Sequence, residues 1–158
     1  MPQPLANFRF SATIAAATAA LALTPVVAAA PAFARTAHAA GKTVHVVEHA
    51  ITDHEVGKDA KGAILTFNNP VFDAANAHQV GHDEGFCVRL QVKLGIWECL
   101  WTTFLKGGQI TVQGPYYDTR NSELSITGGT GAYKGARGQM DLKSRNGGKE
   151  YDFIFHLM

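Results

Sequence analysis

The side chains best suited to metal chemistry in this chain are histidines in two pairs, each pair four residues apart. His45 and His49 form one pair; His78 and His82 form the other, with Asp83 and Glu84 beside it. A spacing of four brings two side chains together only on a helix. On an extended strand, His45 and His49 would stand about 13 Å apart, too far to share one zinc ion. We therefore expect no functional metal site.

A glycine-rich segment at residues 128–138, Gly-Gly-Thr-Gly-Ala-Tyr-Lys-Gly-Ala-Arg-Gly, could suggest phosphate binding. Its glycines follow a GxGxxxG spacing instead of the dinucleotide pattern, and no helical period follows to present a helix N-terminus. We expect these glycines to form turns and close backbone contacts. The chain also lacks a GxSxG motif, so hydrolase chemistry has no support. No cofactor is indicated.

The sequence contains short segments rich in β-branched and aromatic side chains, each bounded by Gly, Pro, Asn or Asp. This composition is typical of β-strands. The segments at 135–144 and 150–157 alternate between apolar and polar residues with a period of two. Short glycine-containing turns between neighbours favour antiparallel hairpins. The sequence thus predicts eight strands: Thr43–His49, Ala63–Asn68, Gly85–Val92, Ile96–Leu105, Gln109–Gln113, Ser122–Thr127, Gly135–Ser144 and Glu150–Leu157. We expect loops at Thr52–Lys61 and Asp73–Glu84.

Eight strands in fewer than 120 residues suit one all-β domain, an eight-stranded antiparallel β-barrel whose interior can hold side chains or one small ligand. Closure of the barrel would also remove exposed strand edges. A two-sheet sandwich is the alternative that fits the same pattern.

The glycine-rich segment and the preceding Val-Gln-Gly-Pro-Tyr at 112–116 resemble the allene oxide cyclase and dirigent barrel superfamily. The resemblance to allene oxide cyclases extends from about Thr43 to the C-terminus. Gly85-Phe86-Cys87-Val88 is similar to the family's Gly-Leu-Cys-Val strand, and Phe67-Asn68-Asn69 to its Phe-x-Asn motif. Members enclose small hydrophobic molecules and steer their ring closure without a cofactor. The resemblance also implies a homotrimer.

Carried over to this chain, the resemblance implies catalytic roles for Glu48, Asn69 and Cys87. Glu48 would stabilise positive charge that develops in the substrate, and Asn69 would hold the substrate oxygen or a water molecule. Cys87 would line the cavity floor, and Phe67 would form an aromatic wall. The family's Asn two residues after the glutamate is replaced here by Ala50.

The orientation of Cys87 is left open by the sequence. If the apolar side of its strand fills the barrel, Cys87 points outward; the resemblance places it inward, where Arg89 would anchor a polar group such as a carboxylate tail. A three-residue turn at 93–95 would set Cys87 opposite Trp101 and diagonal to Cys99. A Cys87–Cys99 disulfide and a free thiol in the cavity are both open.

Tyr116 and Tyr117 lie at a turn near the expected barrel mouth, where they are candidates to contact a ligand.

Residues 1–40 carry the signature of a secretory signal peptide. Ser11–Ala34 is an Ala-rich apolar run that ends near two A-x-A cleavage sites. An uncleaved membrane anchor is the alternative, which Pro25 and Pro31 disfavour. Cleavage near Ala40 would release a secreted or periplasmic domain of residues 41–158.

The charge of the mature domain would be nearly balanced, because Arg9 and Arg35 leave with the leader and one more acidic than basic side chain remains. This balance, with no basic stripe, argues against nucleic-acid binding and against membrane attachment after cleavage. We expect a small hydrophobic molecule as partner. The sequence predicts a cofactor-free isomerase or cyclase, with a non-catalytic, dirigent-like binding protein as the alternative.

Overall fold

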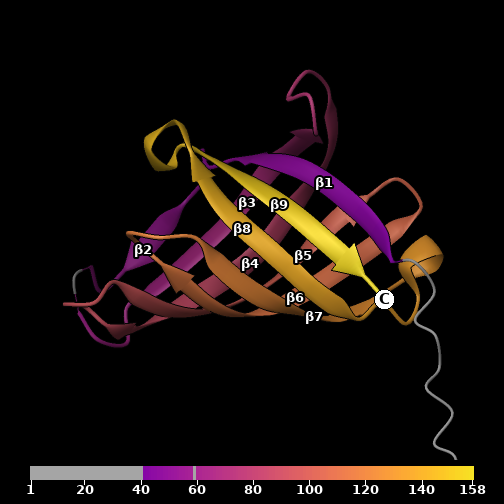
Figure 1. Cartoon of the computed structure of the whole chain (residues 1–158). Coiled ribbons are helices and arrows are strands. Elements are labelled where there is room, and N and C mark those ends of the chain that lie inside the picture. The colour runs from indigo at the N-terminus through magenta and orange to yellow at the C-terminus, as the bar shows by residue number, and fades with distance from the viewer. Residues whose placement is uncertain (1–40, 59) are drawn as a thin grey trace, which may run out of the picture. The chain divides into compact units, whose positions relative to one another are not determined.

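A computed structural model describes residues 41–58 and 60–158, so the expected signal peptide lies outside the described residues. This part of the chain forms nine strands and two short 3-10 turns (Figure 1). None of its helices is long and apolar enough to cross a membrane. In chain order the elements are β1 (Lys42–His49), β2 (His54–Val56), β3 (Ile64–Asp73), β4 (Gln79–Gln91), β5 (Ile96–Leu105), β6 (Gly108–Tyr117), β7 (Ser122–Gly129), η1 (Gly131–Tyr133), β8 (Gly138–Arg145), η2 (Asn146–Gly148) and β9 (Glu150–Leu157).

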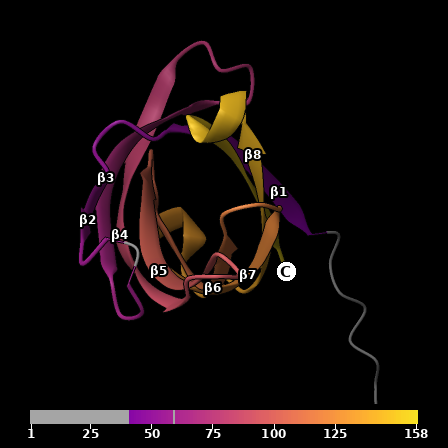
Figure 2. The ribbon, with the colours of Figure 1, turned by 90° about the vertical axis from the view of Figure 1, so that its left-hand side faces the viewer.

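Eight of these strands close into an antiparallel barrel. The sheet runs in the order β1-β9-β8-β7-β6-β5-β4-β3-β2, and β1 also pairs with β3. The β1–β3 pairing aligns Val46 with Asp73 and Glu48 with Val71, which completes the ring seen end-on in Figure 2. The predicted eight-stranded barrel is confirmed, and the sandwich alternative is wrong.

The two predicted loops were too long. The short strand β2 lies within the expected loop Thr52–Lys61, where it adds an edge to β3, and β4 begins at Gln79 within the expected loop Asp73–Glu84. Strand β3 also continues through Pro70, a residue that usually ends a strand. It is tolerated because residues 67–70 have no partner strand on one edge: β2 pairs with β3 only up to Thr66, and β1 pairs from Val71 onward.

Apolar side chains occupy the interior of one half of the barrel. Its side chains are apolar and almost fully buried; they include Ile110, Val112, Ile126, Met140 and Phe155. At the same end, the glycine-rich segment forms the β7–β8 corner, as expected. A side chain on Gly131, whose φ is +57°, would collide with the carbonyl oxygen of Gly107. The other half of the barrel, where β1 ends and β9 begins, contains the pocket described below.

Strand β4 is oriented with its apolar side outward. Phe86 and Leu90 are 45% and 42% exposed, whereas Cys87 and Arg89 on the opposite face are buried. The outward alternative for Cys87 is therefore wrong. Its inward direction brings the polar face of this strand into the barrel.

Cys87 and Cys99 form a disulfide between β4 and β5. The two residues are directly opposite one another, with Cα atoms 4.0 Å apart. The expected register, which placed Cys87 opposite Trp101, is wrong by two residues. The turn spans residues 92–95 and not 93–95, which moves the register by one residue, and a register shift between Arg89 and Gln91 moves it by one more. The free-thiol alternative is thereby excluded.

Replacing both cysteines in Cys87→Ala/Cys99→Ala should lower the free energy of unfolding by about 2–3 kcal/mol, because a cross-link over a short loop mainly constrains the unfolded chain. Urea denaturation measures this loss. Thiol titration of the denatured, unreduced wild-type protein should find no reactive thiol; two reactive thiols would contradict the bridge.

Candidate functional site

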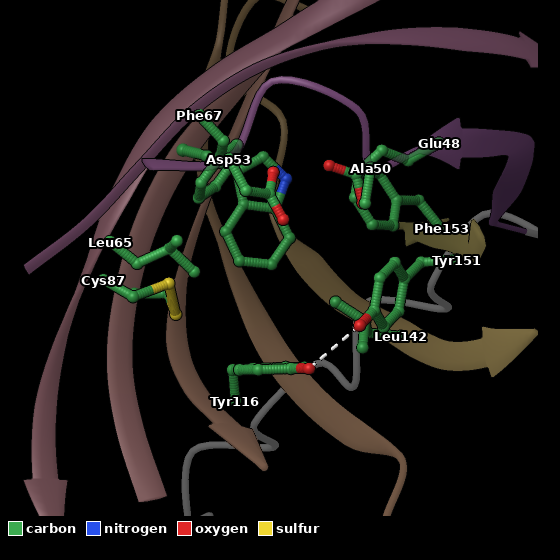
Figure 3. A pocket seen from close by; sticks show the side chains of 12 residues that line it. Glu48, Ala50, Asp53, Leu65, Phe67, Cys87, Tyr116, Leu142, Tyr151 and Phe153 are labelled. Carbon is green, nitrogen blue, oxygen red and sulfur yellow. Dashed lines mark hydrogen bonds between the residues drawn. A yellow bond between two sulfur atoms is a disulfide. The ribbon is translucent and has the colours of Figure 1, made fainter. Parts of the chain in front are cut away.

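A pocket opens into the barrel beside the ends of β1 and β6. It contains about 430 Å³ of empty space, a figure that includes its solvent-open mouth. The lining combines aromatic and aliphatic side chains with two carboxyl groups and the disulfide (Figure 3). The lining residues are Glu48, Ala50, Asp53, Leu65, Phe67, Cys87, Cys99, Trp101, Tyr116, Leu142, Tyr151 and Phe153.

The amide of Asn69 organises the polar side of this pocket. Its Nδ2 donates to Glu48 Oε1 and to Asp53 Oδ1, each at 2.8 Å. Its Oδ1 accepts hydrogen bonds from the main-chain nitrogens of Ile51 and Thr52 and from the Thr52 hydroxyl, at 2.8–3.0 Å. The amide thus uses all its donors and fixes the β1–β2 loop, which brings Asp53 to the pocket.

A third carboxyl group, that of Asp83, lies behind this network. The main-chain N–H of Asn69 donates to Asp83 Oδ1 at 3.2 Å, while Asp83 Oδ2 has no hydrogen-bond partner and the residue is fully buried. Asn69 therefore holds three acidic side chains, from β1, β4 and the β1–β2 loop. No basic side chain forms an ion pair with any of the three in the described part of the chain.

Two of these carboxyl groups, Glu48 and Asp83, retain protons at unusually high pH. Burial raises the pKa of Glu48 to about 7, helped by the nearby charge of Asp53 and opposed by the hydrogen bond from Asn69. Burial and the neighbouring Glu48 raise the pKa of Asp83 to about 9. A group whose pKa lies near neutrality can donate or accept a proton at physiological pH. Glu48 is the one of these two that reaches the pocket.

Aromatic rings form most of the remaining wall. Phe67 meets Trp101 edge to face at 6.1 Å between ring centroids, and Trp101 packs against Phe153 at 5.4 Å. The hydroxyls of Tyr116 and Tyr151 are 3.0 Å apart and share a hydrogen bond. Burial raises the pKa of both tyrosines, so both remain neutral hydroxyl groups. The indole N–H of Trp101 is buried without a partner.

Of the residues that the sequence singled out, Glu48, Phe67, Cys87 and Tyr116 lie in the pocket wall. Asn69 does not line the pocket. It lies behind the wall, where both amide N–H donors and the amide oxygen form hydrogen bonds within the protein. Its arrangement supports a positioning role and not the direct contact with a substrate oxygen that we expected. Cys87 reaches the wall as part of the disulfide and so supplies no thiol.

Arg89 and Tyr117 lie outside this lining. The Arg89 guanidinium is paired with Asp118 and stacks on the Trp97 ring, with its Cζ 3.7 Å from the ring centroid. Trp97 donates to the same carboxyl group at 2.7 Å. Tyr117 lies under the guanidinium of Arg120. The expected role of Arg89 as an anchor for a substrate carboxylate therefore has no support in this geometry.

Sequence reasoning missed Asp53, Asp83 and Tyr151. The first two fell in segments that were expected to be loops. Strand parity could have found Asp83, because it follows the same face as Cys87 once β4 is extended toward its true start. Tyr151 was placed on the apolar face of β9, but nothing in the sequence indicated its partner Tyr116, on a strand more than 30 residues away.

The histidines of the two pairs are each engaged separately. His45 contacts Asp152 and His49 contacts Asn76, while His82 stacks on Phe104. Within residues 41–58 and 60–158, no cluster of three His, Cys, Asp or Glu side chains has the geometry to hold a metal ion.

Residues 43–148 match the family model described as allene oxide cyclase. This range is more than half of the chain, and the chain belongs to that family. The superfamily resemblance found in the sequence is thereby confirmed.

Solved structures show the same fold. A pyocyanin demethylase matches with a TM-score of 0.64 and 20% identity, covering 74% of this chain and all of that one. A pterocarpan synthase dirigent protein matches with a TM-score of 0.61 and 19% sequence identity. The match covers 72% of this chain and 83% of that one. An exo-specific intermolecular Diels-Alderase, AbnU, matches with a TM-score of 0.62 and 16% sequence identity. The match covers 75% of this chain and 98% of that one. At these identities the likeness is one of fold.

The raised pKa values predict that the protein loses stability as the pH rises. Between pH 5 and 7 the folded state keeps protons on Glu48 and Asp83 that the unfolded chain has released, so the free energy of unfolding falls, by at most about 1.4 kcal/mol per pH unit for each group. In Glu48→Gln the curve should be flatter over this window. Urea unfolding at pH 5, 6 and 7 measures both slopes.

Glu123→Gln, an exposed substitution on β7, is the control and should follow the wild-type curve. Parallel curves for Glu48→Gln and the wild type would show that Glu48 has no raised pKa.

Proposed function

We propose that this member of the allene oxide cyclase family is a secreted, cofactor-free isomerase or cyclase that steers the stereoselective ring closure of a small hydrophobic substrate. The observation that carries the proposal is a buried carboxyl group, Glu48, at the wall of an otherwise largely apolar pocket inside a closed barrel. Family membership and the structural likeness to a dirigent protein and a Diels-Alderase support catalytic or dirigent roles for this fold.

The chemistry requires few protein groups. In an intramolecular ring closure one σ bond forms at the expense of π bonding, and no atom enters or leaves. Holding the substrate in a single reactive conformer can contribute ~7–11 kcal/mol to lowering the barrier in well-aligned systems. The aromatic walls would supply that confinement, and the rigid disulfide would limit the pocket at β4 and β5.

Glu48 would supply the electrostatic part. As a carboxylate it would stabilise positive charge that develops on the reacting chain, and Asn69 would keep its position fixed through the 2.8 Å hydrogen bond. Asn69 is thus a positioning residue. The paired hydroxyls of Tyr116 and Tyr151 could donate to an oxygen atom of the substrate.

The alternative is a non-catalytic, dirigent-like protein that binds a small hydrophobic molecule made or oxidised elsewhere. The specific observation in its favour is Ala50, which lines the pocket where the plant cyclases have an asparagine, so that one polar group of their site is missing. The likeness to a pterocarpan synthase dirigent protein fits this role equally well.

Secretion and assembly belong to the proposal. Removal of residues 1–40 is tested by the intact mass of the exported protein. A homotrimer is supported by outward apolar side chains on adjacent strands, where Phe86 pairs with Leu100 and Ile64 with Val88. Light scattering of the purified protein tests the assembly.

The two functions are separated by an isomer-forming assay on the wild-type protein, and Glu48→Gln tests the role of Glu48 in it. Wild-type protein incubated with a fractionated metabolite extract should convert one component into an isomer of identical mass, visible by chiral chromatography with mass spectrometry. Glu48→Gln should slow this conversion by about 10²–10³-fold and reduce enantiomeric excess, while Glu123→Gln should not. Unchanged rate and enantiomeric excess in Glu48→Gln would show that Glu48 has no electrostatic role, whereas no conversion by the wild-type protein would leave the binding function.

A further inference from the structure

The pocket contains a carboxyl group that is placed to act as a base inside the barrel. Glu48 lines the pocket and is only 6% exposed, so little water solvates its charge. Its Oε1 accepts the 2.8 Å hydrogen bond from Asn69, and because a carboxylate has about four acceptor positions, others remain for a ligand. Asp53, the other acidic lining residue, is exposed to water. Glu48 is therefore the better placed base of the two.

The two tyrosine hydroxyls supply a hydrogen-bond donor to the same space. Tyr116 and Tyr151 line the pocket with their oxygens 3.0 Å apart, joined by the dashed line in Figure 3. Two hydroxyl groups carry two hydrogens, and their mutual bond uses one. Neither hydroxyl has a second hydrogen-bond partner within residues 41–58 and 60–158, so one O–H is left for a ligand. It belongs to the hydroxyl that accepts the mutual bond, which strengthens it as a donor.

The register of the barrel keeps the base and the donor together. Glu48 on β1 is directly opposite Tyr151 on β9. Residues in this relation have Cβ atoms about 4.5–5.5 Å apart. Both side chains point inward, since both line the pocket, and the hydrogen bond from Tyr151 to Tyr116 connects β9 with β6, a strand that is not its neighbour in the sheet. A ligand in the pocket therefore meets the carboxyl group and the hydroxyl pair at once.

The rest of the wall strengthens the action of these polar groups. Apolar side chains such as Leu65, Phe67, Leu142 and Phe153 surround them, and none of the twelve lining residues is a lysine, arginine or histidine. Interactions between charges and dipoles are stronger where water is excluded. Donors that are fixed in advance at a developing negative charge are among the largest contributions to catalysis.

A base and a hydroxyl donor in one apolar pocket are the groups that enolisation of a ketone requires. We propose that this pocket has a second activity, the reversible removal of a proton from the carbon next to a carbonyl group, with Glu48 as the base and the Tyr116–Tyr151 pair as donor to the carbonyl oxygen. Its substrates are ketones with apolar substituents and hydrogen on that carbon. The activity goes beyond the proposed ring closure, because no ring has to form.

The step is balanced without an oxidant, a reductant or a co-reactant. The Glu48 carboxylate takes the proton, the electron pair of the broken C–H bond forms a C=C bond, and the π electrons of the carbonyl group move onto its oxygen, to which the tyrosine hydroxyl donates. Return of a proton from Glu48 to the same carbon restores the ketone, with hydrogen exchanged for that of the solvent. Return to a conjugated carbon moves the double bond and yields an isomer.

The groups that face Glu48 set the pH dependence of this activity. They are Asp53 from the β1–β2 loop, Asp83 from β4, Tyr116 from β6 and Tyr151 from β9. Burial raises the pKa of Glu48 to about 7, so the fraction that is ionised and able to act as a base increases about tenfold between pH 6 and pH 8. The exchange rate due to the protein should increase by the same factor.

Deuterium exchange tests the proposal with three ketones of different shape: 2-octanone, cyclohexanone and phenylacetone. Each is incubated in D₂O with and without the purified protein, and deuterium on the carbons next to the carbonyl group is measured by mass spectrometry. The wild-type protein should accelerate exchange of at least one ketone above the rate in buffer alone.

Variants assign the two roles. Glu48→Gln should reduce the protein-dependent exchange rate by about 10²–10⁴-fold and remove its increase with pH. Tyr116→Phe/Tyr151→Phe should reduce the rate by about 10²–10³-fold but keep the increase with pH, because the base is still present. Glu123→Gln, an exposed substitution outside the pocket, should exchange the ketones as the wild type does.

The outcomes separate this activity from the ring closure. No exchange above buffer with any of the three ketones overturns the inference, and the isomer-forming assay decides the proposed function independently. Exchange that persists in Glu48→Gln overturns the assignment of the base, and an unchanged rate in Tyr116→Phe/Tyr151→Phe overturns that of the donor. If Glu48→Gln fails to fold, a wild-type rate that stays constant from pH 6 to pH 8, after subtraction of the buffer rate, overturns Glu48 as the base.

Discussion

The site depends on one side-chain amide. Asn69, on β3, binds the carboxyl groups of Glu48 and Asp53 through Nδ2, holds the β1–β2 loop through Oδ1 and contacts Asp83 through its main-chain nitrogen. Three acidic groups are thereby gathered with no basic partner among the described residues, and two of them, Glu48 and Asp83, are buried. Burial disfavours the charged form of Glu48 and, with the nearby charge of Asp53, raises its pKa to about 7.

The barrel is the part that this chain shares with its relatives, and the lining is the part that distinguishes it. A dirigent protein and a Diels-Alderase have the same fold at 19% and 16% identity. A closed barrel fixes strands rigidly while leaving the inward side chains free to vary, so different chemistries can occupy one scaffold. In this chain one half of the barrel, whose interior holds buried apolar side chains such as Met140 and Phe155, supports the half that contains the pocket.

The sequence predicted the architecture well where local patterns are strong. Strands Ile96–Leu105 and Glu150–Leu157 have the predicted bounds, because alternation and glycine turns act over a few residues.

Prediction from the sequence failed where contacts between distant residues determine the structure. Pro70 concealed the extension of β3, and with it the place of Asn69 inside a strand. The apolar outer side of β4 made the direction of Cys87 ambiguous. The register shift near Arg89 and the longer turn at 92–95, which together align Cys87 with Cys99, were not predicted from the sequence. The carboxyl group of Asp83 was missed because β4 was expected to begin at Gly85, whereas it begins at Gln79.

The central claim is that burial, helped by the nearby charge of Asp53, raises the pKa of Glu48 so that it can hold a proton at neutral pH. It is tested most directly by a carbon-13 NMR titration of the glutamate side-chain carboxyls, with the Glu48 signal assigned from the spectrum of Glu48→Gln. The account predicts a Glu48 transition with a midpoint at about 7, well above the ordinary value of 4.5. A midpoint near 4.5 would contradict it.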